Sequence, residues 1–227
     1  MKRIALSLAS TALVLLTFNA TAHADVTWAT WNYPSIVTGA TGYIGLPSNV
    51  ITYTGQIDGV NFVDGSYGWT PGNTYIGGNI TSAPPNGNLA VLMDGGTSQV
   101  ETITFTTPVF DPVMAIFSLG SDGMTPAPAV FDFTSSEPFS IVAGGPSTHY
   151  GGSSIVYDGP YGISGEEGNG SIQFAGTYST ISFTTPDLEG YYAFTVGSSA
   201  ATPEPGTLAL LGTGLGALSM LRRRFKR

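Results

Sequence analysis

Carboxylates are the main chemically active groups of this 227-residue chain, which has fifteen Asp and Glu, two His and no Cys. Five aspartates precede a glycine, at Asp58, Asp64, Asp94, Asp122 and Asp158. Asp-Gly supplies the positive φ that tight hairpin turns need, so these pairs predict turns. Carboxylates and carbonyls are also the ligands that calcium prefers, although the spacing is not that of an EF-hand loop. We expect turns, and leave open a calcium site to which Asp58 and Asp64 contribute.

A second acidic feature is the pair Glu166 and Glu167 in the turn-prone segment SGEEGNGS. Two carboxyl groups can cleave a glycosidic bond when they lie about 5–10 Å apart on either side of it. Adjacent residues on one loop rarely meet that geometry, so we expect a solvated loop that can bind a cation. His149 is the only histidine after residue 24, which excludes a zinc site built from several His or Cys side chains. No catalytic residue is predicted.

An aromatic stretch, GSYGWTPGNTYIGGN (residues 65–79), has the composition of a loop. Its rings, Tyr67, Trp69 and Tyr75, could stack on a sugar, but large aromatic side chains more often fill the core of a β domain. We expect a carbohydrate-binding platform here, with core packing as the alternative.

The charges are segregated along the chain. All seven Lys and Arg lie at the two ends, and neither residue type occurs from residue 4 to residue 221. Of the fifteen acids only Glu204 lies beyond residue 200, so residues 25–200, which we call the body, carry fourteen acids and no Lys or Arg. Such a body cannot neutralise phosphates, which excludes nucleic-acid binding, and it suits cations or neutral sugars instead.

The body has the pattern of an all-β domain. Short segments rich in Val, Ile, Thr, Phe and Tyr are separated by Gly, Pro, Asn and Asp, and no helical period extends over ten residues. Thr102, Thr104 and Thr106 alternate with Ile103 and Phe105, which predicts a strand with one wet and one buried face. The spacing of such segments predicts an antiparallel β-sandwich or jelly roll.

Part of the body occurs twice. The block TITFTTP at residues 102–108 returns as TISFTTP at residues 180–186, and in both copies a second predicted strand follows the proline. A duplicated structural unit, with equivalent strand pairs, explains this. Convergence on a common β-proline-β turn is the alternative, and two copies are too few to predict a solenoid.

The first residues have the three parts of a secretory signal peptide. Lys2 and Arg3 precede an apolar run, and Ala22 and Ala24 supply the small residues at which signal peptidase cuts. The apolar run is shorter than the ~20 residues of a membrane-spanning helix. We expect residues 1–24 to be removed by the secretion machinery, so that no anchor remains at this end.

The last residues also have three parts. The tripeptide Pro203, Glu204 and Pro205 cannot lie inside a helix or a central strand. Residues 206–221 are uncharged and, as a helix, span about 24 Å, slightly less than the hydrocarbon core. The basic residues that follow should stay in the cytoplasm by the positive-inside rule. They are Arg222, Arg223, Arg224, Lys226 and Arg227.

This arrangement over residues 201–227 resembles the PEP-CTERM sorting signal of Gram-negative bacteria. The resemblance implies a single transmembrane helix that anchors the protein transiently in the inner membrane. It also implies recognition by exosortase, a membrane-embedded protease-transferase that cuts near the tripeptide and passes the body to the cell surface. Such proteins often occur in organisms that make exopolysaccharide. The alternative is a plain membrane anchor that is never cut.

The body is similar to an uncharacterised extracellular β-domain often attached to that tail, in stretches such as DPVMAIFSLGS and AGGPSTHYGG. This similarity implies no activity. We therefore expect a non-enzymatic, surface-sorted protein of the matrix or exopolysaccharide, without a cofactor unless calcium binds. The alternatives are a secreted carbohydrate-active enzyme that uses two carboxylates and a permanently anchored envelope protein.

Overall fold

The computed structural model describes residues 25–32, 39–62, 68–120, 129–134 and 137–199, together with Gly212 and Gly214. Residues 23–202 form one compact unit, which contains the whole body. The predicted signal peptide, the Pro-Glu-Pro tripeptide and the basic stop lie outside the described residues. Of the predicted transmembrane helix only Gly212 and Gly214 are described, and both are α-helical. In the described part of the chain, no helix combines the length and apolar character needed to cross a membrane.

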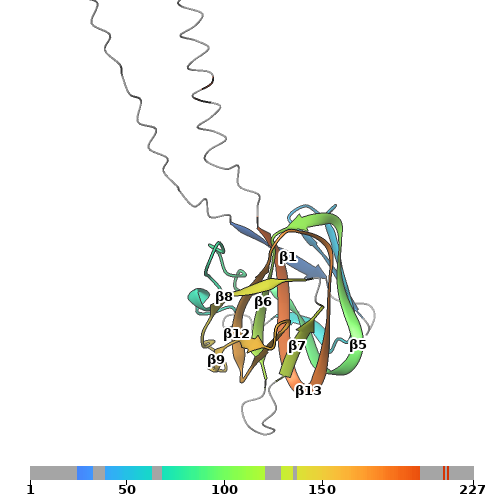
Figure 1. The fold of residues 1–227 in the computed structure, drawn as a ribbon, viewed down its shortest axis with the longest axis vertical. Coiled ribbons are helices and arrows are strands. Elements are labelled where there is room, and N and C mark those ends of the chain that lie inside the picture. Colours follow the sequence, from blue (N-terminus) through green and yellow to red (C-terminus); the bar gives the residue numbers. More distant parts are fainter. Residues whose placement is uncertain are drawn as a thin grey trace, which may run out of the picture. The chain divides into compact units, whose positions relative to one another are not determined.

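The regular secondary structure of the described body is β-strands and one 3-10 turn, η1 (Gly72–Thr74), as Figure 1 shows. The strands are β1 (Val26–Asn32), β2 (Gly39–Ile44), β3 (Val50–Thr54), β4 (Gly59–Phe62), β5 (Leu89–Phe110), β6 (Pro112–Leu119), β7 (Ala129–Phe133), β8 (Phe139–Gly144), β9 (Ser153–Ser154), β10 (Val156–Asp158), β11 (Gly162–Gly165), β12 (Gly168–Phe174) and β13 (Thr177–Ser199). The prediction of an all-β body is confirmed.

Five of these strands close into an antiparallel ring in the order β13, β1, β2, β3 and β5, with β5 pairing back to β13. The remaining strands extend from this ring. All thirteen described strands belong to one hydrogen-bonded sheet. The cause is the length of β5 and β13, whose pairing shifts register at several bulges. Bulges bend a strand, so a long strand can pass around a corner and join layers that a sandwich would keep separate.

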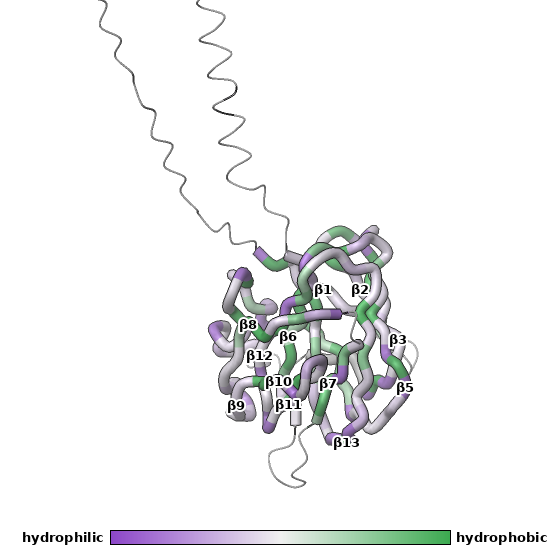
Figure 2. Tube along the Cα trace, viewed as in Figure 1, coloured by the Kyte–Doolittle hydropathy of each residue, from purple (hydrophilic) through white to green (hydrophobic). Residues whose placement is uncertain are grey.

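The strands bury apolar residues on both sides of β6. Met114 and Ile116 face a large cluster together with rings from the closed strands, whereas Val113, Ala115 and Phe117 face a second cluster. The second cluster is covered by the segment before β5, which contributes Trp69, Tyr75 and Ile80. Figure 2 shows hydrophobic and hydrophilic residues alternating along the chain instead of forming one long apolar segment. A strand buried on both faces, like β6, is the exception, because both of its neighbouring layers are apolar.

The two copies of the repeated block lie side by side as antiparallel partners. Ile103 on β5 pairs with Ile181 on β13, which is the equivalent residue 78 positions later. In the second halves of the copies, Ile116 on β6 pairs with Phe194 on β13, again an equivalent pair. Antiparallel pairing at equivalent residues gives each pair a local two-fold axis. The structure therefore supports the duplicated unit over a chance recurrence of one turn.

Candidate functional site

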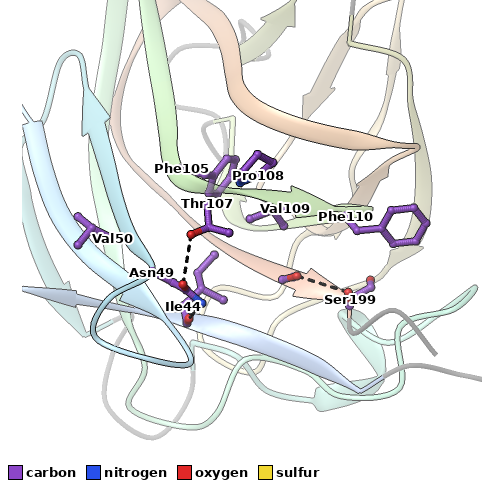
Figure 3. A pocket seen from close by; sticks show the side chains of 10 residues that line it. Ile44, Asn49, Val50, Phe105, Thr107, Pro108, Val109, Phe110 and Ser199 are labelled. Carbon is purple, nitrogen blue, oxygen red and sulfur yellow. Dashed lines mark hydrogen bonds between the residues drawn. The ribbon is translucent and has the colours of Figure 1, made fainter. Parts of the chain in front are cut away.

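A half-open pocket of about 250 Å³ lies where β5 turns into β6, beside the end of β13. Figure 3 shows its side chains, which come from the end of β2, the β2–β3 connection, the start of β3, the end of β5 and the end of β13. Val26 of β1 pairs with Ser199 in the wall of the pocket, so the first and last described strands meet here. The pocket thus lies only a few residues along the chain from the sorting signal.

The pocket has an apolar floor and uncharged polar walls. Phe105 is buried beneath it, and Asn49, Thr107 and Ser198 bring polar atoms to its edge. The Thr107 hydroxyl donates to Asn49 Oδ1 at 3.3 Å, and Asn49 Nδ2 donates to the Ile44 carbonyl at 3.4 Å. These bonds connect the β2–β3 turn to β5 and hold the amide at the rim of the pocket.

Phe110 forms one side of the pocket and remains 48% exposed, although it is a large apolar side chain. The next residue, Asp111, has a φ of 43°, an unusual conformation for a residue other than glycine. It is fixed on both sides, because Asp111 N donates to the Gly176 carbonyl and Gly176 N donates to Asp111 Oδ1, each at 2.7 Å. These two hydrogen bonds connect the backbone next to Phe110 to the turn before β13.

The predicted aromatic platform lies in the core. Trp69 is 2% exposed and Tyr75 is fully buried, and the two rings pack edge to face. Trp69 Nε1 donates to the Asn88 carbonyl and the Tyr75 hydroxyl donates to the Gly68 carbonyl, so both polar atoms are satisfied internally. The platform prediction is wrong for these two residues, because the segment folds back over β6 to cover its second apolar face. Tyr67 lies outside the described residues.

The predicted calcium residues do not converge. Asp58 is exposed and lies near Asp94, whereas Glu166 is exposed and Glu167 half-buried on the turn between β11 and β12. Asp64 lies outside the described residues. Among the residues that the structure describes, no three Asp, Glu or His side chains are grouped in a way that could hold a metal ion. Calcium binding by these residues stays a prediction.

Three glutamates in the described part of the body, which sequence reasoning missed, are buried: Glu101, Glu137 and Glu189. Glu101 is 1% exposed and accepts hydrogen bonds from the Tyr53 hydroxyl, the Gln56 amide and the Thr185 hydroxyl, at 2.8, 2.9 and 2.7 Å. Burial raises the pKa of Glu101, and these three donors act against the rise. The carboxyl joins β3, β5 and β13 and so has a structural role.

Glu189 is also buried, on β13. Its Oε2 accepts a hydrogen bond of 2.8 Å from the Gly120 amide, at the end of β6. Its pKa is raised to about 8, mainly by burial and also by the nearby carboxylates of Glu167 and Asp94, while the hydrogen bond from the Gly120 amide acts against the rise. Glu167 in turn accepts a hydrogen bond from the Ser118 hydroxyl. A carboxyl that stays protonated beside a second carboxylate can serve as an acid, so the pair is chemically notable.

Comparison with known proteins identifies the tail. Residues 201–224 match the family model described as the PEP-CTERM protein-sorting motif. No curated protein and no solved structure matches the chain. The motif implies processing by exosortase, in agreement with the prediction from Pro203, Glu204 and Pro205. This chain therefore carries a PEP-CTERM protein-sorting motif, which marks it as an exported, surface-sorted protein.

Proposed function

We propose that this protein is a non-enzymatic binding or structural component of the surface matrix, associated with exopolysaccharide, in a Gram-negative bacterium. The observation that carries the proposal is the sorting motif joined to a body without Lys or Arg. An acidic body is repelled by phosphate-rich and other anionic surfaces, so it suits neutral polymers and cations. The uncharged pocket beside Phe110 supports this assignment.

We expect the mature protein to lack the basic stop and to be found in the surface or extracellular fraction. Replacing Pro203, Glu204 and Pro205 together with alanine should prevent processing, because the tripeptide is what exosortase reads. Mass spectrometry of the C-terminus in each cell fraction measures this. The variant should keep residues 222–227 and remain with the inner membrane.

A Pro85→Ala variant is the control, since Pro85 is an exposed proline of the body. It should be processed like the wild type. If the wild-type protein itself retains residues 222–227 at the surface, the protein is permanently anchored and the sorting step of the proposal is wrong.

A second candidate function, a carbohydrate-active enzyme, is favoured by one observation, the Glu189 carboxyl with its pKa of about 8 beside Glu167. Glycosidases use one protonated and one ionised carboxyl group. Against it, Glu189 is 8% exposed and is held by the Gly120 amide, which leaves little room for a substrate.

We expect no product when the mature protein is incubated with dextran, galactomannan or alginate, as measured by reducing-end release and chromatography. A matched pair of variants, Glu189→Gln and Glu166→Gln, separates the two functions. Product formation that Glu189→Gln abolishes and Glu166→Gln preserves would establish the enzyme.

A further inference from the structure

The walls of the Phe110 pocket determine the charge of what can bind there. Among the described residues that line it, none is charged, and its polar groups are an amide and hydroxyls. The ligand must therefore be neutral, because a charged group would lose its hydration without gaining a partner. The acidic body adds a long-range repulsion of anions.

The size of the pocket limits the ligand to a small unit. Its volume of about 250 Å³ lies below the roughly 300–1,000 Å³ of sites for drug-sized molecules. The pocket is also open on one side. It can therefore hold one ring of a longer chain while the rest of the chain continues into solvent.

Hydrogen-bonding capacity is present at the rim. Asn49 uses one N–H on the Ile44 carbonyl and its Oδ1 on Thr107, and the described residues supply no acceptor for its second N–H. The Thr107 hydroxyl donates its proton to Asn49, so its oxygen keeps its capacity to accept a hydrogen bond. A donor and an acceptor side by side match a hydroxyl group, which is both.

The exposed Phe110 ring supplies the apolar contact to the ligand. Phe110 keeps 48% of its surface in water at the pocket edge, on the backbone that Asp111 and Gly176 fix. Figure 3 shows the ring standing clear of Phe105 and Pro108. Its equivalent in the other copy of the repeat, Leu188, is 79% exposed and is not part of this pocket. Figure 3 shows the ring at one end of the pocket lining and Asn49 and Thr107 at the other, so a sugar unit that spans the pocket would meet the flat ring with its apolar face and the amide and hydroxyl with its hydroxyl groups.

We propose that this pocket binds a neutral sugar unit of a polysaccharide, which stacks on Phe110 and hydrogen-bonds to Asn49 and Thr107. The proposal rests on the proposed function and names its ligand class and its site. Because Ser199 lines the pocket and residue 201 begins the sorting motif, the sugar would be bound close to the point at which the body leaves its anchor.

The test uses the mature protein and three probes, the neutral polymers dextran and galactomannan and the anionic polymer alginate, with binding measured by calorimetry. We expect binding to at least one neutral polymer and not to alginate. Phe110→Ala and Asn49→Ala should each weaken it about tenfold or more, which corresponds to about 1.4 kcal/mol. Leu188→Ala is the matched control and should bind like the wild type. Circular dichroism melts should confirm that all three variants fold.

The outcomes separate the site from the proposed function. Neutral-polymer binding that survives both Phe110→Ala and Asn49→Ala would overturn the site, while the matrix role stands. Absence of binding to both neutral polymers, or preference for alginate, would overturn the ligand class, and surface localisation is scored independently. A concentration-dependent dimer that Phe110→Ala abolishes would show that a second copy of the chain covers this face, and would also overturn the proposal.

Discussion

Replacing Phe194 with alanine is expected to lower the free energy of unfolding by about 3–5 kcal/mol, the usual cost of removing a buried phenyl ring. Phe194 is fully buried on β13 between β5 and β6, where it pairs with Val91 and Ile116. Its ring lies 5.4–6.3 Å from the rings of four other buried aromatic residues. These are Trp31, Tyr53, Phe131 and Phe183. The substitution would leave a cavity beside β13 and β5, the two strands whose pairing closes the five-stranded ring.

The measurement is urea unfolding followed by tryptophan fluorescence. Phe110→Ala is the matched control, because it removes the same side chain from a long strand but at an exposed position. Its free energy of unfolding should change by less than about 0.5 kcal/mol. Equal losses in the two variants would show that Phe194 is not at the centre of the core.

Strands were predictable from the sequence where one face is exposed to solvent and the other is buried. Ile103 and Phe105 are buried and Thr104 and Thr106 are exposed, as their alternation indicates. The full extent of β5 was not predictable. Gly95 and Gly96, which both have positive φ, interrupt the pattern, yet the strand continues through them as a bulge. Sequence reasoning therefore finds short strands, and only the pairing with β13 shows that they form one.

The aromatic segment before β5 was interpreted wrongly for a related reason. Its Gly and Pro content is typical of a surface loop, and the backbone is indeed irregular there. Trp69 and Tyr75 are buried because β6 has apolar residues on both faces, and another segment must pack over its second face. The residue pattern within the segment does not show that another strand has an apolar face to be covered.

The sorting motif could be predicted from the sequence, whereas the pocket could not. The motif is a local pattern of residues, so Pro203, Glu204 and Pro205 indicated it directly, and the family comparison agrees. The pocket is assembled from the β2–β3 connection, β5 and β13, and no local pattern links Asn49 to Phe110. An apolar residue followed by an acid occurs after Thr-Thr-Pro in both repeat copies, but only Phe110 of the first copy lines the pocket, so this pattern does not predict it.

The buried carboxyls give the body an unusual dependence on pH. The pKa of Glu189 is about 8 in the folded protein against an ordinary 4.5, so the folded state binds the proton more tightly than the unfolded chain does. The stabilising effect of that proton is fully present below pH 4.5 and is lost as the pH rises to about 8. Burial raises the pKa of Glu101 and of Asp94 as well, so their contributions have the same sign. The body has no Lys or Arg, so no ion pair with either residue type opposes the trend.

Replacing Glu189 with glutamine should therefore stabilise the protein at pH 8 and remove much of this dependence. The Glu189 carboxyl alone contributes a slope of about 1.4 kcal/mol per pH unit between pH 4.5 and about 8. The glutamine oxygen can still accept the Gly120 amide proton, so the hydrogen bond is kept while the charge is removed. Urea unfolding at pH 5, 6.5 and 8 measures the slope.

The exposed neighbour of Glu167 provides the control, because Glu166→Gln also removes one negative charge and leaves burial unchanged. The unfolding free energy of Glu166→Gln should change with pH at the same slope as that of the wild type. Both variants remove one negative charge and so weaken the general repulsion between acids. A difference between their pH profiles of unfolding free energy therefore comes from the burial of Glu189. If the two variants flatten the pH profile equally, net charge and not the buried carboxyl governs stability. If neither does, Glu189 is ionised in the folded protein, and the carboxyl pair with Glu167 has no acidic member at neutral pH.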